Sequence, residues 1–221
     1  MSNILYAQNY KVNEKLCIKS IIDNEILTLY AGGCNGDVKL IDRIEYPSKI
    51  SKINFIFGQE ISMKNYIFVS VAYPEDYRDE KNRLNYKGDY NLINVYECNK
   101  SCKISNLFSN YFGSGADIAD LNSGRIIYSF PFKTEKSIKN EINSKLFNQW
   151  ISGKINSGIV WKKTNINDFN NFSLDRIGYL VKGDRFKVTD ISANWIKVIY
   201  TNKSGSTTEG WINCNDTNLC K

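Results

Sequence analysis

The chain has 221 residues, a length that predicts one large domain or two unequal domains with a sizeable hydrophobic core. Its formal net charge of +6 is spread along the sequence, and without an arginine-rich helix, a zinc finger or an RNP-type aromatic string we do not expect nucleic-acid binding. Isoleucine, tyrosine, phenylalanine and valine dominate over alanine and leucine, which predicts a mainly β fold.

The first predicted element is a β-hairpin. The segments "EKLCIKSII" and "EILTLYAGGC" have the composition of strands and flank the turn residues "DN". Antiparallel pairing of these arms brings Cys17 and Cys34 to the same end of the hairpin, where a disulfide would close it.

A long polar segment follows the next two predicted strands. The strands are the apolar stretches "KINFIF" and "NYIFVSVAY", and the segment after them, "PEDYRDEKNRLNYKGD", predicts an exposed loop. Mobile loops on rigid sheets often carry binding residues, and the candidates here are Asp76, Tyr77 and Asp79. The alternative, an insertion without a function, stays open.

A second hairpin is predicted in "YNLINVYECNKSCKISNLF", with its arms meeting at "NKS". Cys98 and Cys102 then face each other across a non-hydrogen-bonded pair, where a Cα separation of about 4.5 Å is within disulfide reach.

One amphipathic helix is predicted at about 135–152. Thr134 is a suitable N-cap, and four apolar residues recur at four-residue spacing: Ile138, Ile142, Leu146 and Trp150. The apolar face of this helix needs a sheet to cover.

The last 60 or so residues carry a specific pattern. The segments "YLVKGDRFKV", "NWIKVIY" and "GSTTEGWI" place a K-G-D turn at 182–184, an aromatic at Trp195 and a G-W-I strand at 210–212. In this order they resemble the bacterial SH3-like (SH3b) family, whose fold is a small barrel of about five strands. We therefore predict a β-rich domain with one helix at 1–158 and an SH3-like barrel at 159–221.

The resemblance implies a binding module without catalysis. SH3-like domains in bacteria recognise cell-wall peptides or protein surfaces through aromatic residues and loops, so the candidates here are Tyr179, Trp195 and Tyr200. An alternative places Trp195 and Trp211 in the core or at an edge of the barrel, and we favour this alternative for Trp211. The family pattern has no counterpart for the tail that holds Cys214 and Cys220.

The six cysteines fall into three sequence-local pairs, which favours disulfides over unpaired thiols or a metal site. Only "CNKSC" has the spacing of a zinc knuckle, and histidine is absent. We expect no metal or other cofactor. Disulfides predict a periplasmic or secreted protein. The opening segment lacks the pattern of a signal peptide, so a secreted form would have lost its signal peptide already. No stretch reaches the ~18 apolar residues of a membrane span.

Catalytic groups are also missing from the sequence. Without histidine, neither Ser-His-Asp nor Cys-His catalysis can operate, and "GSGADIADLNSG" does not match a phosphate-binding loop. The acidic residues of "YPEDYRDE" are adjacent in an exposed run, which is typical of a solvated loop rather than a glycosidase pair. We therefore do not expect an enzyme.

Three functions remain as hypotheses. The first is a periplasmic immunity or inhibitor protein that binds and neutralises a secreted antibacterial toxin, with aromatic residues as anchors. The second is a cell-wall protein that binds peptidoglycan peptides through its SH3-like domain. The third is a redox or metal protein built on the cysteines.

Overall fold

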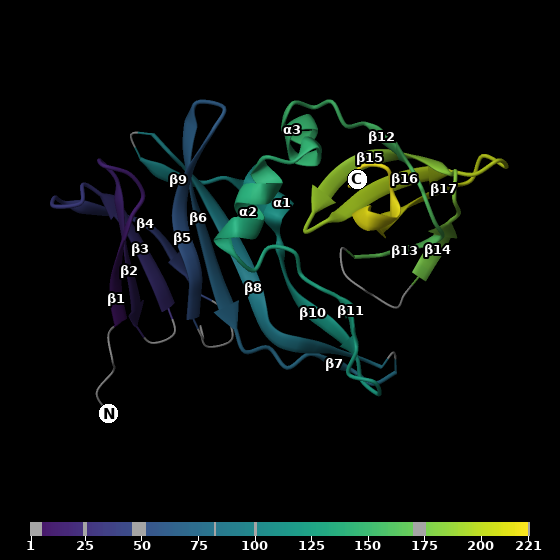
Figure 1. The fold of residues 1–221 in the computed structure, drawn as a ribbon, viewed down its shortest axis with the longest axis horizontal. Helices are drawn as coiled ribbons and strands as arrows, with labels where there is room; N and C mark the ends of the chain where they lie inside the picture. The colour runs from purple at the N-terminus through teal and green to yellow at the C-terminus, as the bar shows by residue number, and fades with distance from the viewer. Residues whose placement is uncertain are drawn as a thin grey trace.

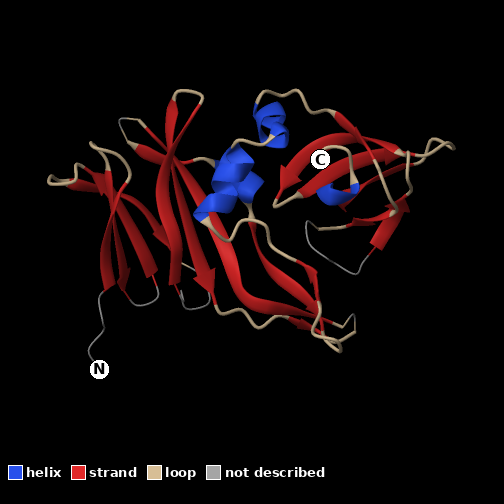
Figure 2. Ribbon diagram, in the orientation of Figure 1, coloured by secondary structure: helices blue, strands red, loops and turns tan. Residues whose placement is uncertain are grey.

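The computed structural model describes residues 6–23, 26–45, 52–81, 83–99, 101–169 and 176–220. Within these ranges the protein is mainly β, as predicted, and its strands form three antiparallel sheets with three α-helices (Figures 1 and 2). We call them the N-terminal, central and C-terminal sheets.

The N-terminal sheet is a four-stranded meander. Its strands are β1 (Tyr6–Lys11), β2 (Cys17–Asp23), β3 (Ile26–Gly32) and β4 (Val38–Ile44), in sequence order. The predicted first hairpin is confirmed, because β2 and β3 pair antiparallel with Cys17 opposite Gly32 and a disulfide joins Cys17 to Cys34. The predicted "DN" turn lies partly outside the described residues.

The central sheet is built around one long strand, β8 (Leu84–Cys98). Its order is β11-β10-β8-β6-β5, with β7 and β9 also paired to β8. The bounds are β5 (Lys52–Ile61), β6 (Lys64–Tyr73), β7 (Arg78–Asp79), β9 (Cys102–Ile104), β10 (Ser114–Asp120) and β11 (Ile126–Tyr128). The second hairpin is confirmed, because Cys98 pairs with Cys102 in register and forms a disulfide across a Cα separation of 4.1 Å.

The prediction of an exposed loop over 74–89 is wrong for its second half. Leu84 is buried and begins β8, with Asp79 of β7 on one side and Asp120 of β10 on the other. The polar residues here lie in a strand because neighbouring strands on both sides supply backbone hydrogen-bond partners.

Both faces of the central sheet are covered. Along β6, Ile67 and Val69 pack with Leu29 of the N-terminal sheet, while Phe68, on the opposite face, packs with Phe112 of the helical layer. Side chains alternate between the faces of a strand, so a sheet covered on both sides requires the continuous apolar run that β6 contains. Figure 1 shows the helices between the central and C-terminal sheets.

The single predicted helix is in fact two, α2 (Glu135–Ile142) and α3 (Lys145–Ile151). Thr134 caps α2 as predicted, accepting a hydrogen bond from the backbone N–H of Ser137. The break follows Ile142, where the Asn143 amide donates to the Lys139 carbonyl at 2.8 Å and the Ser144 hydroxyl caps α3. Such side-chain bonds to the backbone compete with helix continuation.

Another helix, α1 (Asn106–Phe112), lies where the sequence predicts the end of a hairpin arm. Phe108, Tyr111 and Phe112 are buried in the core between the central sheet and α3. This helix therefore belongs to the centre of the molecule.

The C-terminal sheet has the order β12-β15-β16-β17-β13-β14. Its strands are β12 (Ser157–Ile159), β13 (Thr164–Asn167), β14 (Arg176–Leu180), β15 (Arg185–Ser192), β16 (Trp195–Thr201) and β17 (Thr207–Asn213), followed by a short 3₁₀ turn at Cys214–Asp216. The predicted K-G-D turn is present, with the Asp184 carboxylate accepting from the Val181 N–H at 2.8 Å. In the described part of the chain β12 and β14 do not pair, so the sheet does not close into a barrel.

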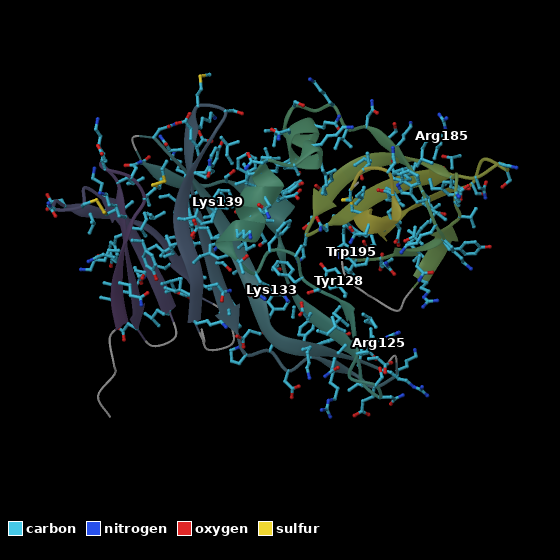
Figure 3. All side chains as sticks on the ribbon, in the orientation of Figure 1. Arg125, Tyr128, Lys133, Lys139, Arg185 and Trp195 are labelled. Atoms are coloured by element: carbon cyan, nitrogen blue, oxygen red, sulfur yellow. A yellow bond between two sulfur atoms is a disulfide. The ribbon has the colours of Figure 1, made fainter. Side chains whose placement is uncertain are left out.

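One hydrophobic core joins the two predicted domains. The turn between β15 and β16 lies against α1, where the Ala193 N–H donates to the Tyr111 carbonyl at 2.8 Å. The Tyr128 hydroxyl of β11 donates to the Ala193 carbonyl at 3.1 Å, and Figure 3 shows its ring beside that of Trp195, at a centroid distance of 5.7 Å. The central and C-terminal sheets therefore share a packed interface.

Candidate functional site

Three tyrosines form a row on β8 and the segment before β7, which we call the tyrosine row: Tyr77, Tyr86 and Tyr90. The rings of Tyr77 and Tyr86 are 4.8 Å apart between centroids, and those of Tyr86 and Tyr90 are 5.6 Å apart. Tyr77 is brought to the strand by its carbonyl, which accepts from the Tyr86 N–H at 3.0 Å. The sequence predicted only Tyr77 of the three.

The row is held at both ends and carries negative charge at one of them. The hydroxyls of Tyr90 and Ser114 are hydrogen-bonded at 2.7 Å, and the Tyr77 hydroxyl lies 3.5 Å from a carboxylate oxygen of Asp79. Partial burial, and then the Asp79 charge, raise the pKa of Tyr77. Tyr77 is still 40% exposed and Asp76 is exposed beside it, so the row presents aromatic surface with an acidic edge.

The C-terminal candidates lie in different environments. Tyr179, on β14, is 58% exposed, and the Lys163 ammonium lies 4.4 Å above its ring centroid, an arrangement that favours cation–π attraction. Tyr200 is half-buried, and partial burial, then the charge of Asp184 in the K-G-D turn, raise its pKa. Tyr179 and Tyr200 are on strands separated by β13 and β17.

The prediction that Trp195 lies on the binding surface is wrong, because only 1% of this residue is exposed. It follows the Ala193 turn directly, and the ring of Tyr128 covers it. The alternative assignment to the core therefore holds for Trp195, whereas Trp211 is only half-buried.

A cleft that the sequence did not reveal lies between the central sheet, α1 and the C-terminal sheet. Its volume is about 480 Å³. The lining residues come from five separate parts of the chain: Leu92, Ile93, Asn94, Ser109, Asn110, Gly113, Ser114, Phe169, Asp190, Ser192 and Trp211. No local pattern identifies such a site, because only the docking of the two parts brings these residues together.

The described residues hold no cluster of three or more side chains that suits a metal ion. One half-buried carboxyl stands out. Glu141 of α2 accepts a hydrogen bond from the Tyr111 hydroxyl of α1, and burial raises its pKa. This contact ties two helices together.

The third predicted disulfide, Cys214 to Cys220, is also present, and Cys214 is fully buried. Three disulfides are compatible with a place outside the cytoplasm. None of the described helices has the length and apolar character needed to cross a membrane.

The fold and surfaces define a β-rich, disulfide-linked chain with an exposed aromatic row, an exposed cation–π pair and a cleft between two sheets. Comparison with known proteins found no matching family model, curated protein or solved structure.

Proposed function

We propose that the chain is a non-enzymatic binding protein of the periplasm or cell exterior and that it neutralises a secreted antibacterial toxin as an immunity protein. The observation that carries the proposal is the tyrosine row. Tyrosine and tryptophan dominate the energetics of protein interfaces because they offer large, rigid contact area with a polar end. Three neighbouring, partly exposed tyrosines, two of them on β8, match that requirement.

The tyrosine row is better suited to binding than a single exposed aromatic side chain, because a strand of the central sheet holds it in place. Tyr86 and Tyr90 belong to β8, where Tyr86 is opposite Ile118 of β10 and Tyr90 is opposite Tyr73 of β6. A partner that covers the row therefore finds side chains already in place, and little conformational entropy is lost on binding. The acidic edge at Asp76 and Asp79 suits a partner with basic residues around an apolar centre.

The test is binding to the product of a neighbouring reading frame, measured with purified proteins and by protection of a susceptible cell. We expect Tyr86→Ala to weaken binding by about 30-fold, corresponding to the loss of about 2 kcal/mol at an interface hot spot. Tyr179→Ala is the matched control on another sheet and should bind normally. Full protection by a Tyr77→Ala/Tyr86→Ala variant would overturn the role of the row.

A second function is supported by the exposed Tyr179 and its cation. We propose, as the alternative, that the C-terminal sheet is an SH3-like module that binds peptidoglycan peptides through Tyr179 and Lys163. The ammonium would pair with a peptide carboxylate while the ring packs on its aliphatic part. Sedimentation with purified sacculi tests this: the full chain should sediment, Tyr179→Ala should not, and Tyr86→Ala should sediment normally.

A further inference from the structure

The cleft between the two sheets has walls of different chemistry. On the side of the C-terminal sheet, Asp190, Lys197 and Trp211 lie in one register line across β15, β16 and β17. Residues directly opposite in an antiparallel sheet point to the same face. Trp211 and Asp190 therefore face the cleft from one rigid surface, and Phe169, 59% exposed, adds a second aromatic ring.

The described residues of the opposite wall carry no charge. Asn110 of α1, which is exposed, contributes polar groups there together with Ser109 and Ser114, and the β8 segment 92–94 completes the wall. The Asn94 side chain points to the other face of the central sheet, because Asn94 is opposite Val69 in the register. The Ser109 hydroxyl accepts from the Val95 N–H at 2.9 Å, so its oxygen is fixed in place. The Asn110 amide offers both donors and an acceptor.

The charges around the cleft argue against an anionic ligand. Among the lining residues that the structure describes, Asp190 is the one ionisable side chain, and its Oδ1 accepts from the Ile191 N–H at 2.8 Å. The nearest cation in the register line, Lys197, is paired with Glu209 at 2.7 Å. Among the described lining residues no cation balances Asp190, so a phosphate or carboxylate ligand would meet this carboxylate.

We propose that this cleft binds a neutral oligosaccharide. A sugar ring has an apolar C–H face that packs on an aromatic ring and hydroxyl groups at its edge that bond to planar amides and carboxylates. Trp211 and Phe169 supply the aromatic surface, and Asp190 and Asn110 supply the acceptors and donors. The volume of about 480 Å³ lies within the range of small-ligand sites, which often form at domain interfaces.

The interface beside the cleft fixes the spacing of its walls. Trp195 is two residues before Lys197 on β16, so it lies on the same face of the C-terminal sheet as Trp211, and there Tyr128 covers it. Ala193 is hydrogen-bonded to Tyr111 and Tyr128 in the same contact. A saccharide would therefore enter a site whose walls are already in position.

The experiment is a titration of the full, oxidised protein with tetrasaccharides of N-acetylglucosamine, β-1,4-linked glucose and mannose, followed by calorimetry and by saturation-transfer NMR. We expect at least one of them to bind, and we expect Trp211→Ala and Asp190→Asn each to weaken that binding about tenfold or more. Trp161→Ala, which alters an exposed tryptophan outside the lining residues, should bind with wild-type affinity.

The Asn110→Ala variant separates a loss of binding from a loss of folding, because this side chain is exposed on α1. Its removal should weaken saccharide binding and leave the melting temperature unchanged. Failure of all three tetrasaccharides to bind at millimolar concentration would overturn the proposal. So would binding that persists in both Trp211→Ala and Asp190→Asn. Tyr86→Ala should retain saccharide binding, which separates this result from the proposed binding of a toxin.

Discussion

A methyl group added at Gly113 is expected to disturb the contact that joins the central and C-terminal sheets. Gly113 ends α1 with φ 63° and ψ −154°, a region of backbone conformation that is almost restricted to glycine and costs other residues about 1–3 kcal/mol. An added Cβ would also lie 2.7 Å from the Ser192 hydroxyl oxygen and 3.3 Å from the Ala193 Cβ. With overpacking included, Gly113→Ala should lower the free energy of unfolding by about 2–4 kcal/mol.

Urea unfolding, followed by tryptophan fluorescence and by circular dichroism, measures this loss. The matched control is Gly124→Ala, where φ is 65° but nothing lies within 4 Å of the added carbon. That control should lose only the backbone cost of about 1–2 kcal/mol. The difference between the two variants contains the close approach of the C-terminal sheet together with any difference in backbone cost between the two glycines.

A double variant tests the contact itself. Ser192→Ala removes the oxygen nearest to the added methyl group, so Gly113→Ala should cost less in a Ser192→Ala background than in the wild-type protein. Equal losses in Gly113→Ala and Gly124→Ala, or no coupling between positions 113 and 192, would refute the reasoning. Two separate unfolding transitions in the wild-type protein would refute the shared core.

Two further predictions concern the covalent links and the interface. Removing the Cys17–Cys34 disulfide, whose cysteines are 17 residues apart, should lower the free energy of unfolding by about 3 kcal/mol. Removing Cys214–Cys220, with a separation of six, should lower it by about 2 kcal/mol. Urea unfolding of the paired serine variants measures both losses, and the reverse order would contradict the loop-entropy account. Burial raises the pKa of Tyr128 to about 12. Because this folded-state pKa lies above the unfolded value of about 10, its contribution to stability is complete below pH 10 and is lost as the pH rises through about 12. Wild-type stability should therefore fall more steeply over that interval than that of Tyr128→Phe, and parallel curves would contradict the assignment.

The features that could be predicted from sequence are local ones. The pairings of Cys98 with Cys102 and of Cys17 with Cys34 follow from strand alternation across a short turn, and Thr134 caps a helix through atoms within one turn of it. Each of these depends on residues close together along the chain. Local propensity and geometry therefore suffice to predict them.

The helix break at Asn143 and Ser144 was not visible in the apolar pattern. Ile142 and Leu146 keep the four-residue spacing across the break, because both helices pack on the same core. What ends α2 is a pair of side-chain bonds to the backbone, which asparagine and serine also make in turns and at helix ends. The apolar stripe therefore predicted which face is buried but not where the helix ends.

The first half of β8 was missed for a tertiary reason. Residues such as Asn85 and Lys87 have no strand preference, yet β7 and β10 pair with them. That pairing places Tyr86 beside Tyr77 and builds the tyrosine row. The candidate residues were thus identified in part, while their arrangement depends on strands distant in sequence.

The two tryptophans of the C-terminal sheet show what strand alternation leaves undecided. The favoured interpretations place Trp195 on the surface and Trp211 in the core or at an edge, yet both lie on one face of the sheet, since Trp211 is opposite Lys197 and Lys197 is two residues beyond Trp195. Alternation separates the two faces but does not say what covers each of them. Here Tyr128 covers Trp195, and the same face stays partly open at Trp211 to form the wall of the cleft. The burial of one tryptophan and the exposure of the other therefore have a common cause, the docking of the Ala193 turn against α1.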